Sequence, residues 1–72
     1  MNRRYLDSVM ILNGDTNKSL SEAIGISLSR LYQKKKGYRG AEFTQGEIKV
    51  IKERYHLNSK EIDKIFFDLK VS

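Results

Sequence analysis

The side chains best suited to chemistry lie in a short polar and basic stretch, residues 28–36, which reads LSRLYQKKK. A helix over these residues would turn four hydrogen-bonding side chains toward solvent: Ser29, Arg30, Gln33 and Lys34. An arginine can donate two hydrogen bonds to guanine O6 and N7, a glutamine can form a bidentate pair with adenine, and a serine can bond to either base. The stretch therefore indicates a helix equipped to read base edges in the major groove of duplex DNA.

A preceding helix and a tight turn would hold this stretch in place. We expect that helix over 17–24, with Asp15 or Thr16 as its N-cap. Its inner face would consist of Leu20, Ala23 and Ile24. Gly25 follows, and a glycine permits the positive φ that a tight turn needs. Ile26 would then anchor the turn in the core.

The second helix of this pair has its own start signal. Ser27 is the expected N-cap, because its hydroxyl can accept a hydrogen bond from the amide of Arg30. Leu31 should point inward, and we expect Tyr32 to be partly buried. Lys35 lies one turn beyond Leu31, so its stem should pack on the core while its ammonium reaches solvent. Two helices joined by such a turn, the second one polar and basic, form a helix-turn-helix that suits the major groove.

Three further helices are predicted, and no stretch alternates between apolar and polar residues as a strand would. The first spans 4–12 and has an apolar stripe of Leu6, Val9 and Met10. The second spans 45–55 and the third 59–68. Each of these two begins at a capping box, Thr44–Glu47 and Asn58–Glu61 respectively. The segment 37–40, which reads GYRG, is expected to be a loop.

The last predicted helix carries more apolar side chains than one stripe can hold. Ile62, Ile65 and Phe66 are expected to face inward. Phe67 is adjacent to Phe66, so both cannot face the same stripe. We therefore expect this region, with Phe66, Phe67 and Leu69, to be the interface of a possible homodimer.

Composition limits the domain organisation and the classes of function. The chain has 72 residues, enough for one small domain over 1–72 with a short disordered tail at about 69–72. A domain of this size buries only about 60% of its unfolded surface, so a dimer interface would help its stability. With no cysteine and one histidine, disulfides and thiolate or histidine-rich metal sites are excluded, and no cofactor is expected.

The chain shows no sign of a membrane or secretory segment. No apolar run approaches the roughly 20 residues that span a bilayer. The start, Met-Asn-Arg-Arg, is followed by mixed polarity and lacks the apolar stretch of a signal peptide. We therefore expect a soluble, cytoplasmic protein with no membrane partner.

The charge distribution favours a polyanionic partner. The formal net charge is +5, from 14 basic and 9 acidic residues. Between Arg30 and Arg39 there are five basic residues and no acid. One region of the surface is therefore expected to be distinctly positive.

The segment from Thr16 to Gly37 resembles the Cro/C1-type (XRE-like) helix-turn-helix family, which includes lambdoid phage repressors and Cro proteins. Eight residues match the family pattern T-Q-x-x-L-A-x-x-x-G-[IV]-S-x-S-x-[ILF]-x-[RQ]: Thr16, Leu20, Gly25, Ile26, Ser27, Ser29, Leu31 and Gln33. The resemblance covers about 6–67, and 31–34 is most similar to small phage and prophage members of Gram-positive bacteria. It implies an all-α, compact five-helix lambda-repressor-like DNA-binding domain, with the helix-turn-helix at its second and third helices.

Three residues depart from the family pattern. Asn17 replaces the usual glutamine, although either amide can hold a phosphate. Ser21 replaces the usual alanine, and its hydroxyl needs a partner if it is buried. Asp15 stands where the family often has an apolar residue, so we expect the helix over 4–12 to be less firmly attached to the next one.

The resemblance also implies which residues would contact DNA. The base-reading positions fall on Leu28, Ser29, Arg30 and Gln33. Leu28 could pack on a thymine methyl group or belong to the core or a dimer surface, Arg30 could lie along a phosphate instead, and Gln33 could simply be solvated. The positions expected to contact the DNA backbone are Thr16, Asn17, Lys18, Lys34, Lys36, Tyr38 and Arg39.

These expectations combine into a sequence-specific transcriptional regulator, a phage or prophage repressor or Cro-like protein, that binds operator DNA through the helix over 28–36. The alternative is a protein–protein interaction module, an antirepressor or antitoxin-like adaptor on the same fold. Its support is a set of spare apolar residues: Ile11, Leu12, Leu28 and Phe67.

An enzyme is not expected. Asp63 and Asp68 have no partner histidine, and no glycine-rich phosphate loop follows a strand. His56 lies at the end of a predicted helix, where capping or a surface position is its expected role. No residue is therefore assigned to catalysis or to a metal.

Overall fold

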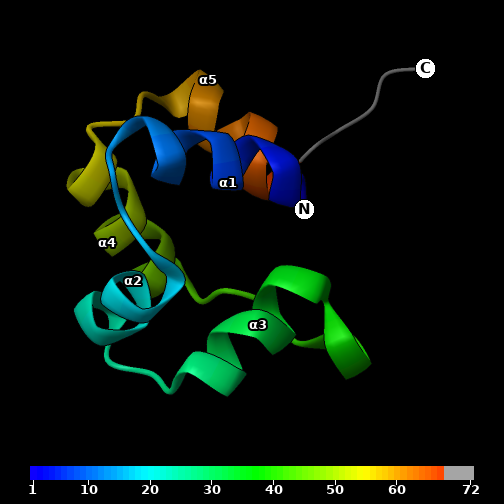
Figure 1. The fold of residues 1–72 in the computed structure, drawn as a ribbon. Coiled ribbons are helices and arrows are strands. Elements are labelled where there is room, and N and C mark those ends of the chain that lie inside the picture. The colour runs from blue at the N-terminus through cyan, green and yellow to red at the C-terminus, as the bar shows by residue number, and fades with distance from the viewer. Residues whose placement is uncertain (68–72) are drawn as a thin grey trace.

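The computed structural model describes residues 1–67, and all the regular secondary structure of these residues is helical (Figure 1). The elements in chain order are α1 (Arg3–Leu12), α2 (Asn17–Ile24), α3 (Leu28–Lys36), the 3₁₀ turn η1 (Tyr38–Gly40), α4 (Gln45–Tyr55), α5 (Ser59–Ile62) and the π-helical segment η2 (Asp63–Phe67). The radius of gyration is 11.5 Å, close to the value of about 11 Å expected for a compact domain of this length. The prediction of a compact all-α fold is confirmed.

Side-chain caps mark where five of the helices begin. Each of five cap residues accepts a hydrogen bond from the backbone amide three residues later: Asn2, Thr16, Ser27, Thr44 and Asn58. Such a bond satisfies one of the donors that a helix start leaves without an internal partner. Both predicted capping boxes form. The predicted ranges 17–24, 28–36 and 45–55 are confirmed, and α1 begins one residue earlier than predicted.

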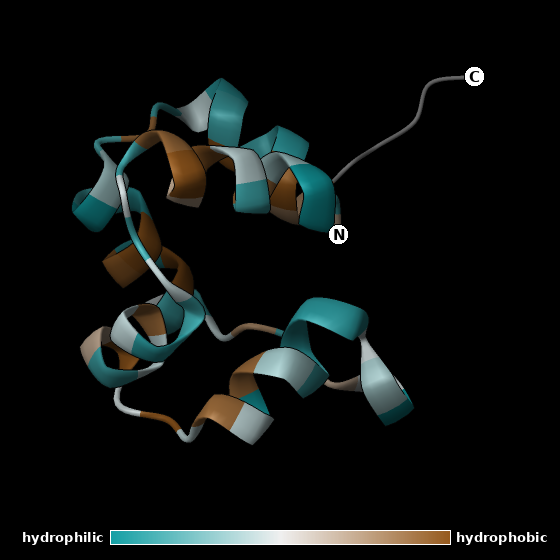
Figure 2. Cartoon of the chain, in the orientation of Figure 1, coloured by the Kyte–Doolittle hydropathy of each residue, from teal (hydrophilic) through white to brown (hydrophobic). Residues whose placement is uncertain are grey.

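The centre of the core takes one fully buried side chain from each of α1, α2, α3, α4 and η2: Leu6, Leu20, Leu31, Ile51 and Ile65. Val9 and Met10 extend this core on α1, as predicted. In Figure 2, hydrophobic and hydrophilic segments alternate along the helices, as expected where one face of each helix is buried.

The burial predicted for Ala23 on α2 and for Tyr32 on α3 is wrong. Ala23 is exposed, and Ser21 is buried in its place. Residues 21 and 23 flank the Leu20–Ile24 stripe on opposite sides, and packing covers the side of residue 21. The Ser21 hydroxyl donates to the carbonyl of Lys18 at 2.7 Å, which supplies the partner that a buried hydroxyl needs. Tyr32, expected to be partly buried, is exposed.

The C-terminal helix is not the continuous α-helix predicted over 59–68. It changes at Ile62 into the wider π-helical turn of η2. Ile62 and Ile65 are buried and Phe66 is half-buried, as predicted. Phe66 packs edge-on against Phe43, with 5.4 Å between ring centroids. Residues 68–72, which include Leu69 of the predicted interface and the predicted tail, lie outside the described part of the chain.

The helices lie in two groups joined by α4 (Figure 1). α1 lies beside η2, where the backbone amide of Asn2 donates to the carbonyl of Ile65 at 2.6 Å. α2 packs against both α3 and α4. None of the helices within residues 1–67 combines the length and the apolar character needed to span a bilayer.

Candidate nucleic-acid interface

The outward face of α3 carries a row of hydrogen-bonding side chains. At about 100° per residue, Ser29, Gln33 and Lys36 fall on one side of the helix, and Arg30 borders them. Gln33 is half-buried and the other three are exposed. Arg30 Nη1 donates to Gln33 Oε1 at 3.2 Å, so these two side chains lie together. The three polar positions predicted to read bases therefore share one solvent-facing surface.

Leu28, the fourth predicted base-reading residue, lies apart from that row. It is more than a third of a turn away from Gln33 around the helix. Its side chain is 36% exposed and is not part of the core cluster. It is next to the exposed ring of Tyr32 on the helix surface. The core alternative for Leu28 is therefore excluded, while its contact with DNA or with a partner stays a prediction.

Lys34 was predicted to face solvent, but it is buried. It is only 6% exposed, and its Nζ bonds to both carboxylate oxygens of Glu47, at 2.6 and 2.7 Å. The same carboxylate accepts from the backbone amide of Thr44 and completes the capping box at the start of α4. Burial alone would raise the pKa of Glu47, but the bonds from Lys34 and Thr44 outweigh it and the net pKa is lowered. Lys34 therefore links α3 to α4 and is not available to a phosphate.

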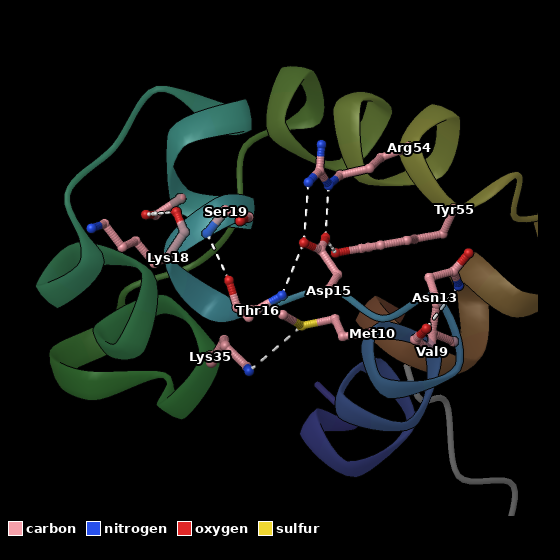
Figure 3. A network of polar contacts seen from close by, with 11 residues as sticks. Val9, Met10, Asn13, Asp15, Thr16, Lys18, Ser19, Lys35, Arg54 and Tyr55 are labelled. Carbon is pink, nitrogen blue, oxygen red and sulfur yellow. Dashed lines mark hydrogen bonds and ion pairs between the residues drawn. The ribbon is translucent and has the colours of Figure 1, made fainter.

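Lys35 is equally buried. Its ammonium was predicted to reach solvent, but it does not. The stem packs as expected, but Nζ donates to Asp7 Oδ1 on α1 and to Asn17 Oδ1 on α2, the latter at 2.8 Å. The sulfur of Met10 lies 4.0 Å from the same nitrogen (Figure 3). Lys35 therefore links α3 to both α1 and α2.

The ion pairs of Lys34 and Lys35 leave fewer cations on the surface than the sequence indicates. Among the five basic residues of 30–39, two are neutralised inside the molecule. The cations that remain on the surface are Arg30, Lys36 and Arg39. Arg39 lies over the ring of Tyr38, 5.2 Å from its centroid, and both residues are exposed beyond the C-terminal end of α3.

The start of α2 presents the other predicted backbone-contact residues. Thr16 and Lys18 are exposed and Asn17 is half-buried. Thr16 Oγ1 accepts from the amide of Ser19 as the helix cap. Within residues 1–67 the backbone amides of Asn17 and Lys18 donate to no protein acceptor, as expected at a helix start. This end of α2 thus offers donors and one exposed cation.

Asp15 forms a network that was not predicted. Its carboxylate accepts from Arg54 Nε at 2.8 Å, from Arg54 Nη2 at 3.1 Å, from the Tyr55 hydroxyl and from the amide of Thr16 (Figure 3). The Arg54 bonds are the main reason why the pKa of Asp15 falls from 3.8 to about 2. Burial and the Asp15 carboxylate raise the pKa of Tyr55. The network ties the α1–α2 loop to α4, while the weak attachment of α1 to α2 expected from the polar Asp15 stays a prediction.

Exposed apolar side chains also lie at the ends of α1 and η2. Ile11 is 76% exposed and, with Leu12, ends α1, while Phe67 is 46% exposed and ends η2. Ile11 borders an open groove of about 740 Å³ between α1, the start of α2 and α3. Tyr32 and Lys36 line the α3 side of this groove. Ile11 therefore shares a groove with Tyr32 and Lys36 of α3, whereas Phe67 lines other hollows of the surface.

No group of three or more His, Cys, Asp or Glu side chains in residues 1–67 is arranged to hold a metal ion. His56 is exposed at the C-cap of α4 with a φ of 55°, so its capping role is confirmed.

No protein-family model, curated protein or solved structure matches the chain significantly.

Proposed function

We propose that this protein is a helix-turn-helix DNA-binding transcriptional regulator of the Cro/C1 type, on a lambda-repressor-like five-helix domain in which α2 and α3 form the motif. The observation that carries the proposal is the outward face of α3, where Ser29 and Arg30 are exposed and Arg30 bonds to the half-buried Gln33. The turn between the two helices supports it, because Gly25 has the left-handed φ of 88°.

In the proposed complex α3 lies in the major groove. Gln33 can form its bidentate pair with adenine, Arg30 can bond to guanine O6 and N7, and Ser29 can bond to either base. The contact between Arg30 and Gln33 would be exchanged for these bonds. Because Lys34 and Lys35 hold the opposite side of α3, the helix is rigidly oriented before it meets DNA, which reduces the entropy lost on binding.

The DNA backbone would be held on both sides of α3. Thr16, Asn17 and Lys18 would contact phosphates at the start of α2, and Lys36, Tyr38 and Arg39 would contact phosphates beyond α3. Lys34 is removed from the predicted set, because Glu47 already occupies its ammonium.

A single domain of this size makes few contacts, so a symmetric homodimer on two half-sites about 34 Å apart is proposed. Phe67 is its candidate anchor, because it is an exposed aromatic residue at the end of η2. Phe66 is less suited, because its ring packs on Phe43. The regulator would repress in the cytoplasm by occluding a promoter, as a phage or prophage repressor or Cro-like protein does.

The proposal is tested by selecting preferred sites from random duplex DNA with the intact protein. Enrichment of a short motif, repeated as a palindrome with a spacing of about one helical turn, is the expected result. Recovery of random sequences, together with no retention on duplex DNA at low salt, would contradict the proposal.

The second candidate function is a protein–protein adaptor, an antirepressor or antitoxin-like module. The exposure of Ile11 and Leu12 at the end of α1 favours it. Retention on heparin or random duplex DNA separates the two candidates. A steep dependence on salt concentration supports DNA binding, since counterions are released from phosphates, and a flat dependence supports the adaptor.

A further inference from the structure

We infer that Lys35 is a positioning residue, which orients the side-chain amide of Asn17 so that its NH₂ group points outward as a donor to a DNA phosphate. The inference rests on the proposed DNA-binding function. Lys35 is buried and cannot touch DNA itself, but it would affect one contact with the DNA backbone, the one made by Asn17.

The geometry places the Lys35 ammonium at one end of the Asn17 amide. Lys35 Nζ is 2.8 Å from Asn17 Oδ1, and the Lys35 side chain is only 4% exposed. The Lys35–Asp7 ion pair holds the ammonium from the other side. The lysine is therefore fixed between α1 and α2 and cannot swing out to a phosphate.

The chemistry of an ammonium decides which end of the amide faces it. A lysine has three donors and no acceptor, so only the amide oxygen of Asn17 can face it. The Asn17 NH₂ group must then point the other way. It donates to no acceptor within residues 1–67, and no polar side-chain atom of these residues is both buried and without a partner. The nitrogen therefore reaches solvent, where a phosphate, which offers only acceptors, could take its hydrogen bond.

The same ammonium also compensates a nearby negative charge. Asp7 is 44% exposed at its side chain and lines the groove beside Asn17. Unpaired, this carboxylate would repel a phosphate, but Lys35 neutralises it. Because the pair has no net charge, Lys35 should affect affinity without adding to the dependence of binding on salt.

The test is a pair of double-mutant cycles with duplex DNA. One cycle combines Asn17→Ala with Lys35→Met/Asp7→Asn, which removes the positioning pair. The matched control combines Asn17→Ala with Lys34→Met/Glu47→Gln, which removes an ion pair whose lysine is equally buried on α3 and does not touch Asn17. Both pair variants leave the net charge unchanged. Circular dichroism establishes that each variant is folded before its affinity is measured.

Asn17→Ala should weaken binding about tenfold in the parent protein, as expected for loss of a charge-assisted hydrogen bond. It should do so again in the Lys34→Met/Glu47→Gln background, but change affinity less than about twofold once Lys35 is gone. The salt slope should stay unchanged in each variant. As a milder change, Lys35→Arg keeps a donor-only cation and should preserve the tenfold effect of Asn17→Ala.

Three results would overturn the inference. The first is an equal effect of Asn17→Ala in the Lys35→Met/Asp7→Asn and Lys34→Met/Glu47→Gln backgrounds. The second is no effect of Asn17→Ala in the parent and Lys35→Arg proteins. Either result removes the positioning role while the proposed function stands. Absence of any duplex binding by the parent protein removes the proposed function as well.

Discussion

Lys34 and Lys35 are neighbours on α3 with the same 6% exposure, but they bond to different helices. Lys34 reaches Glu47 at the start of α4, while Lys35 reaches Asp7 on α1 and Asn17 on α2. A buried charge is costly unless it is paired and hydrogen-bonded. Each lysine is therefore tolerated in the interior only because its partners are in place, and together they fix the orientation of α3.

Removing one member of the Lys34–Glu47 pair should destabilise the fold more than removing both. Lys34→Met leaves a largely buried carboxylate without its cation, so it should lower the free energy of unfolding by about 3 kcal/mol. Adding Glu47→Gln should recover at least about 1 kcal/mol, because no unpaired charge then remains. Urea denaturation at neutral pH measures both values. A double variant less stable than Lys34→Met alone would contradict this account.

At the residue scale, the sequence predicts which side chains of α3 face outward but not the ion pairs of its buried lysines. Helical spacing places Ser29, Arg30 and Gln33 on one outward side, because that depends only on local geometry. The carboxylate partners of Lys34 and Lys35 are 13 and 28 residues away, so local spacing carries no sign of them. A run of three lysines was therefore expected to be more exposed than it is.

At the scale of the elements, helix starts are predicted well because their signals are local. The side chains of Ser27 and Thr44 cap α3 and α4 by accepting from the backbone amides three residues ahead. The π-helical turn of η2 has no such local signal, and its Ile65 and Phe66 pack in a core made of residues distant in sequence. The anchoring of the α1–α2 loop was likewise missed, because Asp15 and Arg54 are 39 residues apart.

That loop should contribute stability that depends on pH. The pKa of Asp15 is lowered from 3.8 to about 2, so the unfolded chain takes up the proton at a higher pH than the folded protein. The contribution is complete above about pH 5 and is lost as pH falls through the folded pKa, for a total of about 2 kcal/mol.

Urea denaturation of the parent protein and Asp15→Asn tests this contribution. The difference in the free energy of unfolding between the two should shrink by about 2 kcal/mol from pH 6 to pH 2. A difference that stays constant over that interval would show that Asp15 is not held as an ionised partner of Arg54.

At the scale of the whole molecule, fewer cations are available to a partner than the 14 basic residues of the sequence suggest. The ion pairs of Lys34, Lys35 and Arg54 remove three cations from the unpaired set within residues 1–67. Lys18 and Lys36 flank the outward face of α3 and remain exposed, so DNA binding should depend on few individual cations.

Lys36→Ala should therefore weaken binding to all duplex sequences and reduce the slope of log affinity against log salt concentration by about 1. Lys49→Ala is the matched control, because Lys49 is an exposed lysine on α4, beside Phe67 rather than near α3. Titration of a random duplex at several salt concentrations gives both slopes. Equal reductions for the two variants would mean that contact with DNA is not centred on α3.

The most direct measurement of the central claim is the ratio of affinities for a selected site and a scrambled duplex, for the parent protein and for Arg30→Ala/Gln33→Ala. If α3 reads bases with these side chains, the ratio should fall at least about tenfold in the variant, while affinity for the scrambled duplex falls far less. An unchanged ratio would contradict the account, because sequence preference would then arise elsewhere on the molecule.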